Sequence, residues 1–435
     1  MNISEIDATI LDGSVKGIPG NTEPFPLGRI GAKGWNILRE DLPLPLAVLR
    51  HSALRHNGHW MRQFLARSGA VIAPHGKTTM SPQLFRDQLA DGAWAITVAT
   101  TQQLRVCRDF GIERAVLANQ LVGRQAISYV LAELKRDGAF DFYCLVDSVA
   151  NVEQLAAAAR AVAPGRPLQV LLEGGMVGGR TGCRDVAAAL AVGRAVKAAA
   201  PYLALCGVEG FEGLVHTESP ADDAATVSRF LDFLVELSIA CEKADLFTPG
   251  QIIISAGGSA FYDLVVERFG KAGIARDVLV VTRSGCYLTH DSKMYREAFA
   301  EIRKRSPTLD NLGPGLMPAL EVWAYVQSRP EPTKAILTVG KRDISYDLDL
   351  PVPLKWVRPG AGVDAHAIAE IGAGHVVTGL NDQHCHLAVP ADSPLAVGDM
   401  VGFGISHPCT TFDKWDVIPL VDDDYTVVSA IKTFF

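Results

Sequence analysis

The chain has 435 residues, which is longer than one ordinary folding core and predicts two domains or one large barrel with an appendage. Its composition, 48% apolar and 20% charged, is typical of a globular protein. The net charge of −7 argues against nucleic acid or an anionic membrane surface as the main partner.

The sequence carries no pattern of membrane insertion or secretion. No apolar run approaches the ~20 residues needed to span a bilayer, and the first residues, MNISEIDATILDGS, lack a basic stretch followed by an apolar one. The eight cysteines stand singly in apolar or helical contexts, which is typical of reduced thiols. We therefore expect a cytoplasmic protein without a disulfide framework.

The first segment, residues 1–49, is an arm rich in Gly and Pro that closes with the strand-like LPLAVLR. Because LAVLR has no helix before it and needs a sheet to pair with, we expect the arm to join the last domain of the chain.

Residues 50–305 alternate between strand-length apolar runs and segments with helical spacing, such as Leu155, Ala159 and Val162. Thr100 and Gln103 have the spacing of a helix-starting capping box. The apolar runs occupy residues 71–75, 95–99, 115–119, 142–146, 168–173, 203–211, 251–255 and 278–283. Eight alternations match a TIM-type (β/α)8 barrel, while a doubly wound open sheet remains the alternative.

The alternation of strand-like and helix-like segments ends after Arg305. The stretch LGPGLMP leads into short strands separated by frequent turn residues, among them LEVWAYV, AILTVG, HVVTGL and YTVVSAIKTFF. Residues 306–435 are therefore predicted to form an all-β domain.

The stretch VIAPHGKTTM, residues 71–80, holds the most informative lysine. Lys77 follows an apolar run and His75, at the point where a strand would end. A lysine becomes a nucleophile for carbonyl groups when desolvation or a neighbouring cation lowers its pKa from about 10.4 toward neutrality. The letters GKT also suggest a phosphate loop, but that motif needs a glycine where Val71 stands.

Three more stretches follow predicted strands. EGGMVGGRTG, residues 173–182, resembles a nucleotide-binding phosphate loop except that Arg180 replaces the required lysine. SAGGS, residues 255–259, and RSGCY, residues 283–287, follow the seventh and eighth runs, where barrels often bind phosphate. Glycines there let backbone N–H groups close on an anion. Glu212 and His216, after the sixth run, are predicted to be structural hydrogen-bonding groups.

Two histidine-containing stretches in the last domain suggest a metal site. His407 and Cys409 alternate along a predicted strand, so both can reach one metal, and imidazole with thiolate suits zinc. His384 and His386 have the same spacing and form a competing pair. A site with few protein ligands would leave positions for substrate, as catalytic zinc requires.

Taken together, the motifs APHGKTTMSPQLF, LANQLVG, SAGGS, RSGCY and HPCTT resemble the D-serine dehydratase and D-threonine aldolase family. Its members are pyridoxal phosphate enzymes of the alanine racemase fold type. The resemblance implies a TIM-type barrel that carries the cofactor lysine, a C-terminal β domain, and a homodimer whose active sites lie near the domain and subunit interface.

The resemblance also assigns roles to residues of this chain. Lys77 resembles the lysine that forms a Schiff base with pyridoxal phosphate, and His407 and Cys409 match the family's zinc pair. Aldolase members tend to have aspartate in place of that cysteine, so Cys409 favours a dehydratase. The predicted cofactor-binding residues are Lys77, His75, Arg180, Ser255, Gly257, Gly258, Ser259, Gly285, Cys286 and Tyr287.

We therefore predict a pyridoxal phosphate and Zn²⁺-dependent D-serine deaminase acting on D-serine or a related β-hydroxy D-amino acid. The alternatives are a D-threonine or 3-hydroxy-D-aspartate aldolase and a non-catalytic pyridoxal phosphate carrier. Such carriers usually have a single domain, so the predicted β domain counts against that alternative. Ala73 and Met80 depart from the residues that many family members have there, and this leaves the substrate open.

Overall fold

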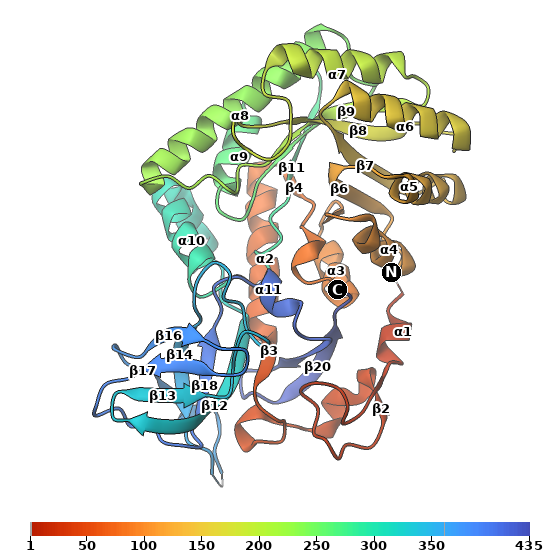
Figure 1. Cartoon of the computed structure of the whole chain (residues 1–435). Helices are drawn as coiled ribbons and strands as arrows, with labels where there is room; N and C mark the ends of the chain where they lie inside the picture. Colours follow the sequence, from red (N-terminus) through yellow and green to blue (C-terminus); the bar gives the residue numbers. More distant parts are fainter. Residues whose placement is uncertain (1, 361) are drawn as a thin grey trace.

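The structure is a computed structural model that describes residues 2–360 and 362–435. Figure 1 shows two lobes, a barrel surrounded by helices and a β domain below it. None of the described helices is long and apolar enough to cross a membrane.

Eight parallel strands form the barrel, in the order β4-β11-β10-β9-β8-β7-β6-β5. A bridge between His75 and Thr97 links the two ends of this order. Each predicted apolar run overlaps one strand, so the predicted barrel is confirmed and the doubly wound alternative is wrong. The strands are β4 (Val71–Ile72), β5 (Ile96–Val98), β6 (Arg114–Gln120), β7 (Asp141–Val146), β8 (Leu168–Gly174), β9 (Leu203–Gly210), β10 (Ile252–Ala256) and β11 (Val278–Thr282).

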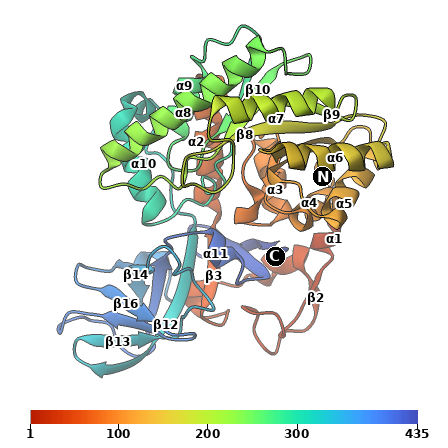
Figure 2. The same ribbon diagram turned by 45° about the horizontal axis from the view of Figure 1, so that its top comes forward.

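Helices follow the strands and cover the outside of the barrel, as Figure 2 shows. Thr100 caps one of them by accepting a hydrogen bond from the Gln103 backbone N–H at 3.2 Å, as the capping-box spacing predicts. The helices are α2 (His51–Ser68), α3 (Pro82–Ala90), α4 (Thr101–Asp109), α5 (Arg124–Arg136), α6 (Val149–Val162), α7 (Val186–Ala198), α8 (Pro220–Lys243), α9 (Tyr262–Phe269) and α10 (Met294–Arg305).

Apolar side chains fill the barrel interior. Val116, Leu171, Ile253 and Val281 belong to one buried cluster contributed by strands around the sheet. Because the interior is packed, a ligand site has room only at an end of the barrel.

A ten-stranded, mainly antiparallel sheet forms the β domain. Its strands are β3 (Leu46–Arg50), β12 (Leu320–Glu331), β13 (Lys334–Leu337), β14 (Val352–Val357), β15 (Ala369–Glu370), β16 (Val376–Leu380), β17 (Cys385–Ala388), β18 (Met400–Gly404), β19 (Val417–Val421) and β20 (Val427–Lys432).

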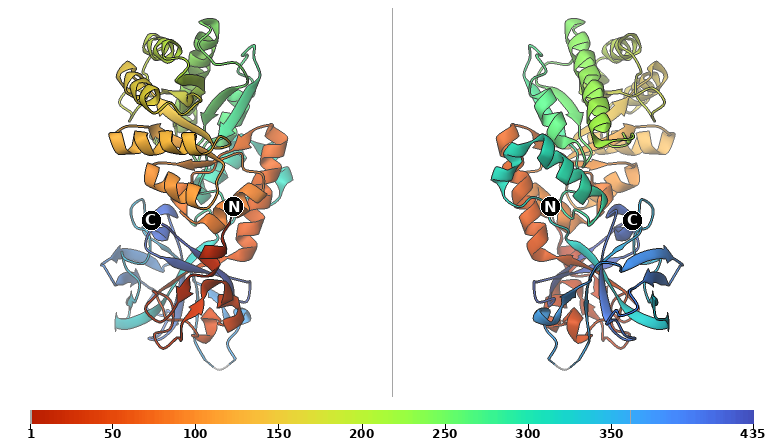
Figure 3. Two further views of the ribbon diagram at one scale, coloured as in Figure 1. Left: turned by 90° about the vertical axis from the view of Figure 1, so that its right-hand side faces the viewer. Right: turned by 90° about the vertical axis from the view of Figure 1, so that its left-hand side faces the viewer.

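The N-terminal arm belongs to this sheet through β3. Leu49 pairs with Leu320 of β12 on one side and with Leu420 of β19 on the other. Figure 3 shows the N-terminal segment beside the β domain in both views. The short helix α11 (Cys409–Phe412) lies between the β domain and the barrel in Figure 1.

Candidate functional site

A cavity of about 970 Å³ lies where the carboxyl ends of the barrel strands meet the β domain. Ten of the twelve predicted site residues line it, namely His75, Lys77, Arg180, Gly257, Gly258, Ser259, Gly285, Cys286, His407 and Cys409. Ser255 and Tyr287 do not. Side chains more than 300 residues apart in sequence therefore meet in one chamber.

Lys77 lies on the turn Gly76–Thr78, which begins four residues after the end of the first barrel strand. Gly76 packs so closely that an added Cβ would come within 2.9 Å of both Ile96 and Phe85. The Lys77 amine has no hydrogen bond or ion pair within residues 2–360 and 362–435 and lines the cavity. A free primary amine is thus presented to any ligand in the chamber.

The His75 ring beside Lys77 is kept neutral. Burial lowers the pKa of His75 well below its ordinary value, and the positive charges of Lys77 and Arg283 lower it further. Its Nδ1 atom is buried without a hydrogen-bond partner among the described residues. A buried polar atom of this kind is available to a polar group of a bound ligand.

The glycines of the SAGGS turn were predicted to offer their backbone N–H groups to an anion, but these groups bind a side chain of the protein instead. The backbone N–H groups of Gly257 and Gly258 donate to the two carboxylate oxygens of the fully buried Glu212, at 3.0 and 2.6 Å. Glu212 is thus a structural hydrogen-bonding group that fixes the turn.

The N–H groups that remain open belong to the neighbouring residues. Those of Ser259, Ala260 and Gly285 have no hydrogen-bond partner in the described part of the chain, and all three residues line the cavity. Gly285 lies so close to the lysine turn that an added Cβ would stand 2.6 Å from the His75 carbonyl oxygen. Three free N–H groups beside a free lysine fit a ligand that carries both a phosphate and a carbonyl group, as pyridoxal phosphate does.

A buried ion pair between Arg283 and Glu209 forms another part of the cavity wall. Arg283 also donates from Nε to Ser255 Oγ at 3.1 Å and from Nη2 to the Gly210 carbonyl at 3.0 Å. Ser255 therefore supports Arg283 from outside the cavity lining. Burial raises the pKa of Glu209, against the lowering effect of Arg283.

Sequence reasoning assigned no role to three charged residues in this wall, Glu173, Glu209 and Arg283, although two of the stretches that it singled out begin with Glu173 and Arg283. Each stands at or near the carboxyl end of an otherwise apolar barrel run, where the site of a TIM barrel forms. A charged residue at the end of an apolar run was the sequence signal that could have identified them as site residues. Glu173 accepts hydrogen bonds from Gln120 and from Thr181, the latter at 2.7 Å.

Two thiols meet at the border of the barrel and the β domain. Cys286 Sγ and Cys409 Sγ lie 3.9 Å apart, and Thr78 Oγ1 is 3.8 and 3.5 Å from them, respectively. Hydrogen bonds from Cys286 and His407 lower the pKa of Cys409 well below its ordinary value, although burial opposes them. The same contact with Cys409, together with burial, raises the pKa of Cys286.

His407 is oriented by a carboxylate. Its Nδ1 lies 2.6 Å from Asp347 Oδ2, and the other Asp347 oxygen accepts from Thr410 Oγ1 at 2.5 Å. Burial acts to lower the pKa of His407, but Cys409 and Asp347 raise it to about 9. Nε2 of this ring and the Cys409 sulfur are donor atoms of the kind that zinc prefers. A carboxylate hydrogen-bonded to Nδ1 is typical of a metal-binding histidine.

The local structure of this pair differs from the prediction. His407 lies in the loop after β18 and Cys409 begins α11, because Pro408 cannot continue the predicted strand. No group of three His, Cys, Asp or Glu side chains in the described ranges is placed to share a metal. Any metal held here would thus keep open positions. The competing pair lies elsewhere: His386 on β17 contacts Asn381 at 2.7 Å, and neither it nor His384 lines the cavity.

Tyr287 faces away from the cavity. Its hydroxyl hydrogen-bonds to Gln88, and burial raises its pKa. Tyr295 lines the cavity instead, with its hydroxyl beside the Cys286 thiol. The hydroxyl predicted on Tyr287 does not line this chamber, and the tyrosine that does, Tyr295, lies in α10 and not in the RSGCY stretch.

The phosphate-loop alternative around Arg180 also fails on geometry. A phosphate loop needs the helix N-terminus to face the anion, but Asp185 caps α7 and accepts from the Ala188 backbone N–H at 2.8 Å. Arg180 instead stacks over the Phe211 ring, with 4.8 Å from its guanidinium carbon to the ring centroid.

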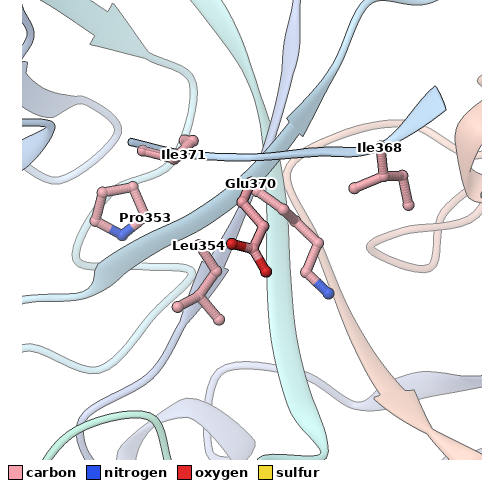
Figure 4. Close-up of a pocket in the computed structure, with 6 residues that line it drawn as sticks. Pro353, Leu354, Ile368, Glu370 and Ile371 are labelled. Carbon is pink, nitrogen blue, oxygen red and sulfur yellow. The ribbon is translucent and has the colours of Figure 1, made fainter. Parts of the chain in front are cut away.

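A smaller hollow of about 460 Å³ lies on the β domain between β14 and β15 (Figure 4). Its lining has four apolar side chains and two charged ones, Lys355 and Glu370. Lys355 is already bonded to Glu321 Oε1 at 2.7 Å and to the Tyr425 hydroxyl at 2.8 Å. This hollow lacks the free reactive groups of the larger cavity.

Comparison with known proteins places the two lobes in one family. Residues 49–262 match the alanine racemase N-terminal domain, and residues 319–421 match the putative serine dehydratase domain. The chain is 24% identical over 389 residues to a D-threonine aldolase of an Arthrobacter species, covering 87% of this chain and 89% of that one.

Two solved structures share the whole fold. The D-threonine aldolase from Filomicrobium marinum superposes with a TM-score of 0.73 at 21% identity, covering 92% of this chain and 97% of that one. The D-threo-3-hydroxyaspartate dehydratase from Delftia sp. HT23 superposes with a TM-score of 0.71 at 22% identity, covering 92% of this chain and 99% of that one. With both domains matched in order, the chain belongs to the fold-type III pyridoxal phosphate family that includes these aldolases and dehydratases.

Proposed function

We propose that this chain is a pyridoxal phosphate and zinc-dependent lyase that converts D-serine, or a related β-hydroxy D-amino acid, to a keto acid and ammonia. One observation carries the proposal. The free amine of Lys77 shares a cavity with an open set of backbone N–H groups on one side and with the pair His407 and Cys409 on the other.

The cofactor, when bound, supplies an electron sink that stabilises negative charge at the substrate Cα. The N–H groups of Ser259, Ala260 and Gly285 would bind its phosphate, and Lys77 would hold its carbonyl carbon. The Nζ of Lys77, when it is not attached to the cofactor, would take the proton from the substrate Cα. His75 is kept neutral, so it adds no positive charge beside the Lys77 amine.

His407 Nε2 and Cys409 Sγ would hold the zinc, which would supply a Lewis acid to make the substrate's β-hydroxyl a better leaving group. The Asp347 carboxylate keeps the His407 ring in position. A related dehydratase has been described in a metal-free form as a Cys→Ala variant, which supports metal binding in the family.

Aldol cleavage is the second candidate, because the D-threonine aldolase relative matches 87% of this chain. An aldolase would remove the hydroxyl proton and break the Cα–Cβ bond, and the same cavity residues serve that reaction. We favour dehydration because Cys409 occupies the metal position where aldolases tend to have aspartate.

The test supplies pyridoxal phosphate and Zn²⁺ and assays both sets of products from D-serine and D-threonine. Keto acid and ammonia, abolished by chelation and by Lys77→Ala, would support the dehydratase; glycine and aldehyde would overturn it in favour of the aldolase. Bound cofactor without turnover of either substrate, with metal present, would favour a non-catalytic carrier.

Cofactor attachment is tested separately from activity by borohydride reduction and peptide mass mapping. The reduced adduct should lie on Lys77 and not on Lys293, the other lysine of the cavity, whose amine is bonded to Asp349. An adduct on Lys293, or none at all, would contradict the role of Lys77.

We also propose that the protein is a cytoplasmic homodimer. All eight cysteines are free thiols, which suits a reducing compartment. Light scattering of the purified chain would test the dimer.

A further inference from the structure

The thiols of Cys286 and Cys409 differ from all other cysteines of the chain. They line the cavity and lie 3.9 Å apart, with Cys409 half-buried and Cys286 buried, whereas none of the other six cysteines lines the cavity. A small solute in the cavity can therefore reach these two sulfurs selectively.

We propose that Cys286 and Cys409 form a reversible intramolecular disulfide when hydrogen peroxide enters the cavity. A disulfide needs about 2.05 Å between the sulfurs, so they must approach by about 1.9 Å. A change of χ1 rotamer at one cysteine can move a sulfur by this much. Cys409 is the first residue of the four-residue helix α11 and directly follows its N-cap residue, Pro408.

One molecule of hydrogen peroxide is the only oxidant that this reaction needs. The Cys409 thiol reacts with one hydrogen peroxide to give a sulfenic acid and one water. The Cys286 thiol then attacks that sulfur, the S–S bond forms, and the sulfenic oxygen leaves as a second water. Two thiols lose two electrons in total, and the peroxide is reduced to two waters.

The disulfide would have two structural consequences. It would join the loop after β11 in the barrel to the first residue of α11 in the β domain. It would also consume the Cys409 thiol that the proposed zinc site uses. The inference itself depends only on the two thiols, so it does not require the proposed reaction to be correct.

The experiment treats the full-length chain, dialysed against a chelator, with hydrogen peroxide and maps its peptides without reduction. We expect loss of two of the eight free thiols and one linked pair of peptides containing Cys286 and Cys409, which dithiothreitol separates. Cys286→Ser should abolish the linked pair. The matched control Cys206→Ser should keep it, because Cys206 is buried outside the cavity and contacts Gln169 Oε1 at 3.7 Å, as a serine hydroxyl can.

Two results would overturn the inference. One is a map in which peroxide leaves Cys286 and Cys409 unlinked while other cysteines react. The other is oxidation of Cys409 to sulfinic acid with Cys286 still reduced. If Cys286→Ser does not fold, the wild-type map alone decides between these results. Since the readout is peptide mass, it is independent of cofactor loading and turnover.

Discussion

Replacing Gly285 with alanine should disturb the site through a single added methyl group. The backbone of Gly285 has no positive φ, so alanine can adopt its conformation. The cost arises from contact, because the new Cβ would lie 2.6 Å from the His75 carbonyl oxygen and 2.7 Å from Thr78 Oγ1. These two residues flank Lys77 in the sequence.

The size of the effect follows from these distances. Ordinary contact of about 3.4 Å requires the loop around Gly285 and the lysine turn to separate by roughly 0.8 Å. Overpacking of this kind costs about 1–3 kcal/mol of unfolding free energy. Displacement of a reactive group by about 1 Å can cost about 100-fold in rate, so attachment of the cofactor to Lys77 should slow by up to about this factor.

Urea unfolding and borohydride trapping of pyridoxal phosphate on the Lys77 peptide measure the two effects. Gly138→Ala is the matched control, since Gly138 is exposed, has no positive φ and would meet nothing within 4 Å. We expect this control to keep wild-type stability and trapping. Equal behaviour of Gly285→Ala and Gly138→Ala in both assays would refute the close packing of Gly285 against the lysine turn.

Three further substitutions test the groups around the cavity. Glu212→Gln leaves one acceptor oxygen for two backbone N–H groups and should cost about 1–3 kcal/mol in urea unfolding, whereas the exposed control Glu218→Gln should be neutral. Arg283→Met leaves Glu209 buried without its cation and should cost about 3–5 kcal/mol; adding Glu209→Gln should restore part of this, and no recovery would contradict the ion pair. Burial lowers the pKa of His290 in the folded chain from its ordinary value of 6.5 to about 4. As the pH falls below about 6.5, the unfolded chain therefore binds a proton at this histidine before the folded chain does. The folded chain loses stability between about pH 6.5 and pH 4 for this reason. Between these pH values wild type should lose about 3 kcal/mol more than His290→Asn, as followed by unfolding at each pH.

The barrel was predictable because its signals are local. Each apolar run is about as long as a strand, and the segments between the runs have helical spacing, so neither signal depends on distant contacts. The Thr100 cap was predictable for the same reason, since both of its partners lie within four residues. The motif residues at the strand ends converge because parallel barrel strands present their carboxyl ends on one face.

The errors in the site arise from side-chain direction and from distant partners. Tyr287 and Tyr295 both follow β11, but Tyr287 is buried against Gln88 of α3, whereas Tyr295 lines the cavity. Glu212 reaches a turn that lies 45 residues further along the chain, and no spacing rule predicts this. The strand assigned to His407 and Cys409 was avoidable, because Pro408 between them removes a backbone donor.

The distance between Lys77 and the thiol pair is set by the contact between the two domains. Thr78, next to Lys77, contacts both sulfurs, so the lysine turn and α11 touch directly. The last strand reinforces this contact: Met80 accepts a hydrogen bond from the Phe434 backbone N–H at 2.9 Å, and Gln83 Oε1 accepts from the Lys432 backbone N–H at 3.2 Å. The barrel therefore supplies the amine and the anion-binding groups, while the docked β domain brings the imidazole and one thiol within reach of them. Neither domain alone contains the site.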